Sequence, residues 1–222
     1  MPDLVRRLAA EAVGSAFLVA AVVGSGIMAT SLTTDVALAL LANTVATGAM
    51  LVVLVTIFGP ISGAHFNPAI SLVFAVRGDL SRRDFLGYAS AQIAGAVAGT
   101  AFAHLMFGRD LFTLSETVRT GGAQWFSEGV AAFGLTLVIL LGLRGDRGAI
   151  PWLVGLYVTA GYWFTASTCF ANPAVAIARA LTDSFAGVRP IDLPGFAAAE
   201  FAGALVALLF CSLMFPAEKA KA

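Results

Sequence analysis

Long stretches without a charged side chain constrain this 222-residue sequence more than any other feature. Four of them lie between Glu11 and Asp35, Asp35 and Arg77, Asp84 and Arg109, and Arg147 and Arg179. Only 12% of the residues are charged, whereas a soluble domain has about 25%. In lipid, a helix of about 20 apolar residues satisfies its own backbone hydrogen bonds and crosses the bilayer. The uncharged stretches therefore predict an all-α membrane protein.

Six membrane spans fit the apolar stretches, at about 5–30, 35–58, 82–107, 125–145, 148–168 and 190–215. None alternates with the period of two that is typical of a membrane β-barrel. With the N-terminus in the cytoplasm, nine of the 13 Lys and Arg residues fall on the cytoplasmic side, as the positive-inside rule requires. We therefore expect both termini in the cytoplasm. The two isolated cysteines, Cys169 and Cys211, predict neither a disulfide framework nor a metal site.

The two halves of the chain resemble each other. Residues 91–107 and 199–215 are identical at eight of 17 positions, and the tripeptide Asn-Pro-Ala occurs at 67–69 and again at 172–174. Glu11 and Glu128 occupy similar places near the starts of the first and fourth spans. Because each half has three spans, the second half enters the membrane from the opposite side, which is an inverted repeat. We expect one domain over 1–222, with repeats at about 5–107 and 125–215.

Each Asn-Pro-Ala tripeptide precedes an apolar run that is too short to cross the bilayer. The residues concerned are Asn67, Pro68, Ala69, Asn172, Pro173 and Ala174. Asn is a favoured N-cap and Pro a favoured first helical residue, and ten helical residues span about 15 Å, half of the hydrocarbon core. The pattern predicts two re-entrant half-helices that meet at the midplane. Their positive ends and amide donors would accept a neutral hydroxylated solute and repel a cation.

These features together resemble the aquaporin family of major intrinsic proteins. The resemblance rests on SGAHFNPAIS at 62–71, ANPAV at 171–175, the pair Glu11 and Glu128, and the inverted six-span layout. It implies six transmembrane helices with two re-entrant half-helices, and a homotetramer with one pore per protomer in a bacterial inner membrane. It also implies passive flow of water or small uncharged solutes. No cofactor, metal, nucleic acid or enzymatic activity is expected.

The resemblance implies an outer selectivity filter of four residues. Three fall at Thr47, Ala160 and Cys169 by counting back from the motif asparagines, and the fourth is Val175, directly after the second tripeptide. Most family members have an arginine directly after the second tripeptide, where this chain has Val175, so the likeness is to an arginine-lacking bacterial branch. Small or medium side chains at all four positions imply a wide filter. We therefore expect passage of water and of glycerol-like or urea-like solutes. Metalloid hydroxides such as arsenous acid are expected as well.

Two residues near the ends of the predicted pore have two interpretations each. Arg179 lies one helical turn beyond Val175, and either lines the outer vestibule or makes a structural pair with Asp183 or a tetramer contact. His65 precedes the first tripeptide and either faces the inner pore mouth or packs within its loop. Both interpretations of each residue fit the sequence.

Four polar residues occupy equivalent places within the predicted spans of the two repeats. An ionisable residue inside a membrane is a functional candidate, so Glu11 and Glu128 either relay protons or accept hydrogen bonds from the re-entrant loops. Their equivalence favours the second role. Gln92 and Glu200 are also equivalent, and we expect them to be polar contacts between helices.

Two other classes of membrane protein compete with a channel. Ion-coupled secondary transporters are also built from inverted repeats and broken helices, but they need an ion site or titratable relay near the midplane. This sequence offers asparagine and backbone there. A purely structural membrane protein is the third class, and the short loops give it no binding module. A passive channel is the favoured prediction.

Overall fold

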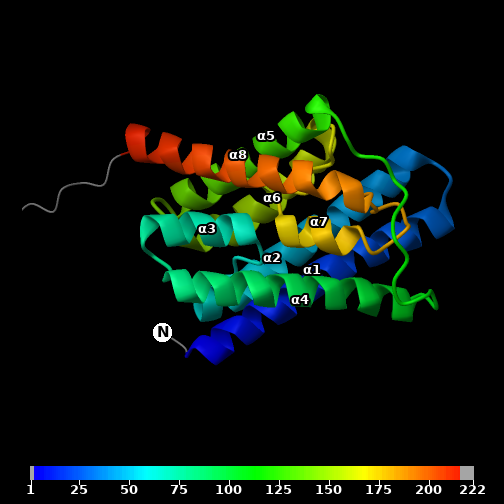
Figure 1. Cartoon of the computed structure of the whole chain (residues 1–222), viewed down its shortest axis with the longest axis horizontal. Coiled ribbons are helices and arrows are strands. Elements are labelled where there is room, and N and C mark those ends of the chain that lie inside the picture. Colours follow the sequence, from blue (N-terminus) through cyan, green and yellow to red (C-terminus); the bar gives the residue numbers. More distant parts are fainter. Residues whose placement is uncertain (1–2, 216–222) are drawn as a thin grey trace, which may run out of the picture.

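The computed structural model describes residues 3–215, and this part of the chain is helical without any strand. Eight α-helices, labelled as in Figure 1, account for most of it. They are α1 (Leu4–Leu32), α2 (Val36–Ser62), α3 (Pro68–Arg77), α4 (Arg82–Met106), α5 (Gly122–Gly142), α6 (Ile150–Phe164), α7 (Pro173–Arg179) and α8 (Leu193–Met214). Short 3-10 turns at Arg147–Ala149 and Pro190–Asp192 lead into α6 and α8. Six longer helices and two short ones confirm the predicted fold class.

The six longer helices differ in how membrane-like they are. α1, α2, α5 and the helical segment Pro190–Met214 are long and apolar enough to cross a bilayer. Two of the predicted spans do not reach that standard, because α6 has only 15 residues and α4 carries several polar side chains. Tyr88, Gln92 and Thr100 of α4 are fully buried against other helices, so they need not meet lipid.

Helix boundaries follow local signals in the sequence. Asp3 and Asp35 cap α1 and α2, since their Oδ1 atoms accept hydrogen bonds from the amides of Arg6 and Ala37, both at 2.8 Å. α2 ends at Gly63, whose φ of 92° is the left-handed conformation that glycine adopts without strain. These ends leave residues 63–67 free to turn back toward α3.

The two repeats pack in the same way. α1 lies along α4, and α5 lies along α8. A side chain at Gly95 or Gly99 of α4 would overlap the backbone of α1, and one at Gly203 of α8 would overlap the backbone of α5 at Gly129. Both halves therefore bring two helices into close contact at small residues.

Replacing Gly95 with leucine is expected to prevent α1 and α4 from packing. Overpacking a filled interior costs about 1–3 kcal/mol or more, and here the obstacle is the backbone carbonyl of Ala12, which cannot move aside. Gly122→Leu is the control, because open space surrounds that position. Monodisperse protein recovered by size-exclusion chromatography should fall for the first variant and not for the second. Equal recovery would contradict this packing.

The half-helices α3 and α7 occupy the centre of the molecule. Figure 1 shows them lying end to end, between α4 on one side and α8 on the other, and both contact both of these helices. α3 and α7 also contact each other. Segments about a hundred residues apart in the sequence thus meet in the middle of the fold.

Candidate functional site

The two asparagines of the repeated tripeptide start the half-helices as predicted. The Asn67 Oδ1 accepts a hydrogen bond from the amide of Ala69 at 2.8 Å, and Pro68 is the first residue of α3. The Asn172 Oδ1 accepts one from the amide of Ala174 at 3.0 Å, with Pro173 first in α7. Each asparagine is therefore an N-cap, and both positive helix ends face the same central region.

The same asparagines also tie the two loops together. The Asn67 Nδ2 donates to the carbonyl of Ala171 at 2.6 Å, and the Asn172 Nδ2 donates to the carbonyl of Phe66 at 2.8 Å. A carboxamide nitrogen carries two hydrogens. One hydrogen of each asparagine is used in this cross-link, so one rather than two remains for a solute. The meeting of the half-helices is thus fixed by reciprocal hydrogen bonds.

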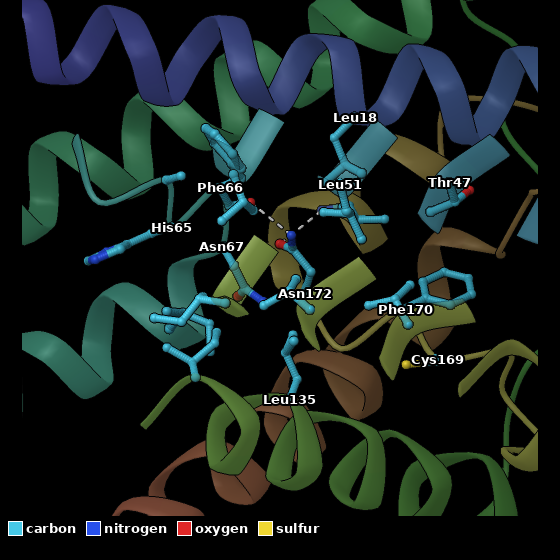
Figure 2. Close-up of a pocket in the computed structure, with 18 of the residues that line it drawn as sticks. Leu18, Thr47, Leu51, His65, Phe66, Asn67, Leu135, Cys169, Phe170 and Asn172 are labelled. Atoms are coloured by element: carbon cyan, nitrogen blue, oxygen red, sulfur yellow. Dashed lines mark hydrogen bonds between the residues drawn. The ribbon is translucent and has the colours of Figure 1, made fainter. Parts of the chain in front are cut away.

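A narrow cavity of about 160 Å³ runs past both asparagines. Figure 2 shows Asn67 and Asn172 at its centre, with His65 toward one end and Thr47 and Phe170 toward the other. Apolar side chains complete the wall, among them Leu18, Leu51 and Leu135. The cavity therefore has a mainly apolar wall with the asparagines near its middle.

A wider cavity of about 900 Å³ adjoins the narrow one. Gly63, His65, Phe74 and Leu143 line both, so His65 lies where the two meet. Its Nδ1 lies 3.0 Å from the Ser71 Oγ, and the ring is half-buried. Four arginines line the wider cavity, namely Arg7, Arg77, Arg144 and Arg147. This basic end is the one that the charge distribution predicts to be cytoplasmic.

Three of the four expected filter residues line the narrow cavity, and Ala160 does not. Thr47, Cys169 and Val175 are buried around it. Ala160 is exposed and is absent from the described residues that form the wall. The wall residues of α6 are Ile150, Val154, Val158 and Tyr162. Ala160 is two residues from both Val158 and Tyr162, so it lies about 200° around the helix from each of them. The prediction that Ala160 lines the filter was therefore wrong.

Tyr162 occupies the place that Ala160 was expected to fill. Its side chain is buried in the cavity wall, and its Oη lies 3.2 Å from the Thr47 Oγ1. The four-residue spacing of the wall positions along α6 is the sequence signal that could have identified it. The outer constriction therefore contains an aromatic hydroxyl that was not predicted from the sequence.

Arg179 lines the narrow cavity, as the vestibule interpretation requires. The carbon at the centre of its guanidinium lies 3.4 Å from the centre of the Phe170 ring, and its Nε donates to the carbonyl of Ala186. It makes no ion pair with Asp183 within residues 3–215. Asp183 instead accepts a hydrogen bond from the amide of Glu116. The predicted pair with Asp183 is therefore not formed.

A second arginine, Arg119, approaches the same aromatic ring and was not singled out from the sequence. Its guanidinium lies 5.2 Å from the centre of Phe170. It donates hydrogen bonds to the carbonyls of Gly187 and Ser167, at 2.9 and 3.2 Å. Burial away from water lowers the pKa of Arg119, and the charge of Glu128 opposes that shift. Two guanidinium groups thus flank Phe170 near the filter.

Glu11 and Glu128 hold the loops that precede the half-helices. Glu11 accepts hydrogen bonds from the amides of His65 and Phe66, at 3.0 and 2.7 Å, and from the Ser62 hydroxyl. Glu128 accepts them from the amides of Phe170 and Ala171, also at 3.0 and 2.7 Å. The loop-supporting interpretation is therefore the one that the geometry favours.

These loops need support because their backbone is strained. Ala64 and Phe66 have φ values of 51° and 49°, and the equivalent Cys169 and Ala171 have 53° and 49°. Such conformations cost non-glycine residues of order 1–3 kcal/mol each. The hydrogen bonds to the two buried carboxyls offset part of that cost. The two halves therefore use the same device to present the asparagines.

Comparisons with known proteins agree with this architecture. The family model described as "Major intrinsic protein" matches residues 1–166. Aquaglyceroporin AqpS of Rhizobium meliloti (strain 1021) is 68% identical over 206 residues, which are 93% of this chain and 88% of that protein. Aquaporin NIP1-1 of Zea mays is 33% identical over 158 residues, which are 70% of this chain and 55% of that protein.

A solved structure gives the same fold. The aquaglyceroporin from Plasmodium falciparum superposes with a TM-score of 0.74 over 96% of this chain and 97% of that one, at 21% sequence identity. The chain belongs to the major intrinsic protein family. It is a multi-pass membrane channel for water and small neutral solutes, and it is not an enzyme. The prediction of a passive channel is confirmed, and the ion-coupled transporter is set aside.

Proposed function

We propose that this channel has a wide, weakly polar outer filter, formed by Thr47, Tyr162, Cys169 and Val175, and that it conducts uncharged solutes larger than water. The observation that carries the proposal is the side chain of Val175. It stands directly after the second tripeptide, faces the cavity and brings neither charge nor hydrogen-bond donors. Arg179, one turn further along α7, lines the same cavity, and its guanidinium stacks on the ring of Phe170.

The lining suits solutes that have one apolar and one hydrogen-bonding side. The wall is mostly hydrocarbon from residues such as Leu18, Leu51 and Leu135, and each asparagine has one amide hydrogen left to donate. A polyol, a urea-like molecule or a metalloid hydroxide such as arsenous acid can turn its oxygens toward these donors. The 68% identical relative is named an aquaglyceroporin, which agrees with such solutes.

Cations are disfavoured by the charge distribution along the path. The N-termini of α3 and α7 both point at the asparagines, and each resembles roughly half a positive charge. Arg119 and Arg179 add positive charge near the filter. A proton or metal ion would have to shed water while entering a positive field.

The setting of the channel follows from its outer surface and its charged ends. Large apolar side chains such as Phe17, Leu41 and Leu156 are exposed on the outward faces of the helices, where lipid or neighbouring protomers can cover them. We place the protein in a bacterial inner membrane as a homotetramer with both termini cytoplasmic. The arginine-lined cavity supports that orientation, because positive charge gathers on the cytoplasmic side.

Osmotic assays in liposomes test the proposal. Vesicles containing the purified protein should re-swell in glycerol, urea and arsenous acid gradients roughly tenfold faster than empty vesicles, as a fall of about 1.4 kcal/mol in the barrier would give. The rates should rise linearly with solute concentration and ignore sodium or proton gradients. Acceleration of water alone would contradict the wide filter. Dependence on an ion gradient would contradict a passive channel.

A further inference from the structure

The two repeats differ at one buried position beside the supporting carboxyls. α4 carries Gln92 where α8 carries Glu200, and both side chains are completely buried. Gln92 contacts Glu11, and Glu200 lies within hydrogen-bonding reach of Glu128. The first half therefore pairs a carboxylate with an amide, whereas the second half pairs two carboxyl groups.

The side-chain amide of Gln92 donates two hydrogen bonds in the first half. The Gln92 Nε2 donates one hydrogen to Glu11 at 2.7 Å and the other to the Ser71 Oγ at 2.9 Å. The residue equivalent to Ser71, 105 positions later, is Ala176, which has no side-chain acceptor. In the second half, Glu128 is therefore the one remaining side-chain acceptor, where the first half has Glu11 and Ser71. A protonated carboxyl group has a single hydrogen to donate, which is enough for one acceptor.

The backbone brings the two carboxyl groups of the second half together. Glu128 accepts hydrogen bonds from the amides of Phe170 and Ala171, and the Glu200 Oε1 accepts one from the next amide, that of Asn172, at 2.9 Å. Three consecutive N–H groups are thus held by two side chains. The Glu200 Oε2 is buried and has no partner within residues 3–215. This is the oxygen on which a proton would complete the network.

Neither Glu128 nor Glu200 forms an ion pair with an arginine within residues 3–215. The charged or titratable groups that act on this pair are Arg179 of α7, Arg119 of the loop before α5, the thiol of Cys169 and the phenol of Tyr157 of α6. Both arginines stack on Phe170 and direct their hydrogen bonds to backbone carbonyls. Two ionised carboxylates in contact inside a protein repel each other strongly and lose their hydration. A shared proton removes the repulsion and leaves one buried charge in place of two.

We propose that Glu200 is protonated, donates a hydrogen bond to Glu128 and accepts one from the amide of Asn172, and so positions the backbone of Asn172 at the centre of the pore. Glu200 is a positioning residue, because it touches the loop and not the solute. Its protonated carboxyl donates to Glu128 as the amide of Gln92 donates to Glu11. The supporting carboxyl then receives a hydrogen bond from an amide in the first repeat and from a carboxylic acid in the second.

Replacement of Glu200 by glutamine tests this assignment, because an amide keeps both the donor toward Glu128 and the acceptor for Asn172. Infrared spectra of the wild-type protein in lipid at neutral pH should contain the carbonyl band of a buried, protonated carboxylic acid. Glu200→Gln should abolish that band and keep glycerol flux within about twofold of wild type. Glu200→Ala, which removes donor and acceptor, should lower flux roughly tenfold, equivalent to about 1.4 kcal/mol.

The controls distinguish a shared proton from a pair of ionised carboxylates. Glu116→Gln, at an exposed loop position, should leave both the band and the flux unchanged. A wild-type spectrum without the acid band, or a band that persists in Glu200→Gln, would overturn the proposal. Flux in Glu200→Gln as low as in Glu200→Ala would also overturn it, because a charged pair holding a bound cation would be impaired by either change.

Discussion

Replacing Glu128 with alanine is expected to abolish channel activity and to lower the yield of folded protein. The change removes the acceptor for the buried amides of Phe170 and Ala171, and each unsatisfied group costs about 1–3 kcal/mol. Folded proteins are stable by only about 5–15 kcal/mol. Ala171 also has the positive φ that the carboxyl helps to maintain. Without the Glu128 carboxyl, the carbonyl of Ala171, which accepts the hydrogen bond from Asn67, should move.

Flux of water and of glycerol per reconstituted protein, together with thermal unfolding in detergent, measures this effect. Glu116→Ala is the matched control, since Glu116 is an exposed carboxyl of the loop before α5. Glu11→Ala should be at least as damaging, because Glu11 accepts from two amides and a hydroxyl. Normal flux and normal unfolding in Glu128→Ala would show that the loop does not depend on this carboxyl. A change confined to the pH dependence would restore the proton-relay interpretation.

The fold was predictable because short, local sequence patterns determine its main features. Uncharged stretches mark the spans, and Asp3 and Asp35 mark helix starts through their side-chain oxygens. The tripeptide at 67–69 predicts where α3 begins, because asparagine is favoured as an N-cap and proline as the first residue of a helix. The repeat then predicts the second half from the first. No long-range contact has to be known for any of these steps.

The filter was harder because a count along the sequence does not fix which way a side chain points. Ala160 was assigned by counting back from Asn172 across residues 165–172, which are not helical. Thr168 and Cys169 in that stretch have positive φ. Such a backbone does not rotate by a constant angle per residue. Counting across it therefore does not show which residues of α6 face the cavity. Within α6 itself, Val154 and Val158 face the cavity four residues apart, and the same spacing leads to Tyr162.

Contacts between distant segments were also beyond the reach of sequence patterns. Arg119 precedes α5, and Arg179 ends α7, yet both meet the ring of Phe170. Only the folded course of the loop between α4 and α5 brings Arg119 there. The proton assigned to Glu200 is of the same kind, because it follows from contact with Glu128 and not from the identity of either residue alone.

Introducing arginine in place of Val175 is expected to cut the flux of glycerol and urea by at least about tenfold, a rise of about 1.4 kcal/mol in the barrier, while water flow remains measurable. Val175 lies in the wall of a cavity of only about 160 Å³, which Thr47 and Tyr162 also line. An arginine side chain is much longer and adds five N–H donors. It would narrow the passage and hold the waters that a larger solute must displace.

Two further substitutions separate the causes of that loss. Val175→Leu adds bulk without charge, so a small decrease in solute flux would assign most of the arginine effect to charge and bound water. Val175→Ala should keep or raise solute flux, because it widens the same point. Water flow shows in each case that the variant is folded and inserted. Solute flux in Val175→Arg equal to that of wild type would mean that Val175 does not define the constriction, and the proposal of a wide filter would then fail.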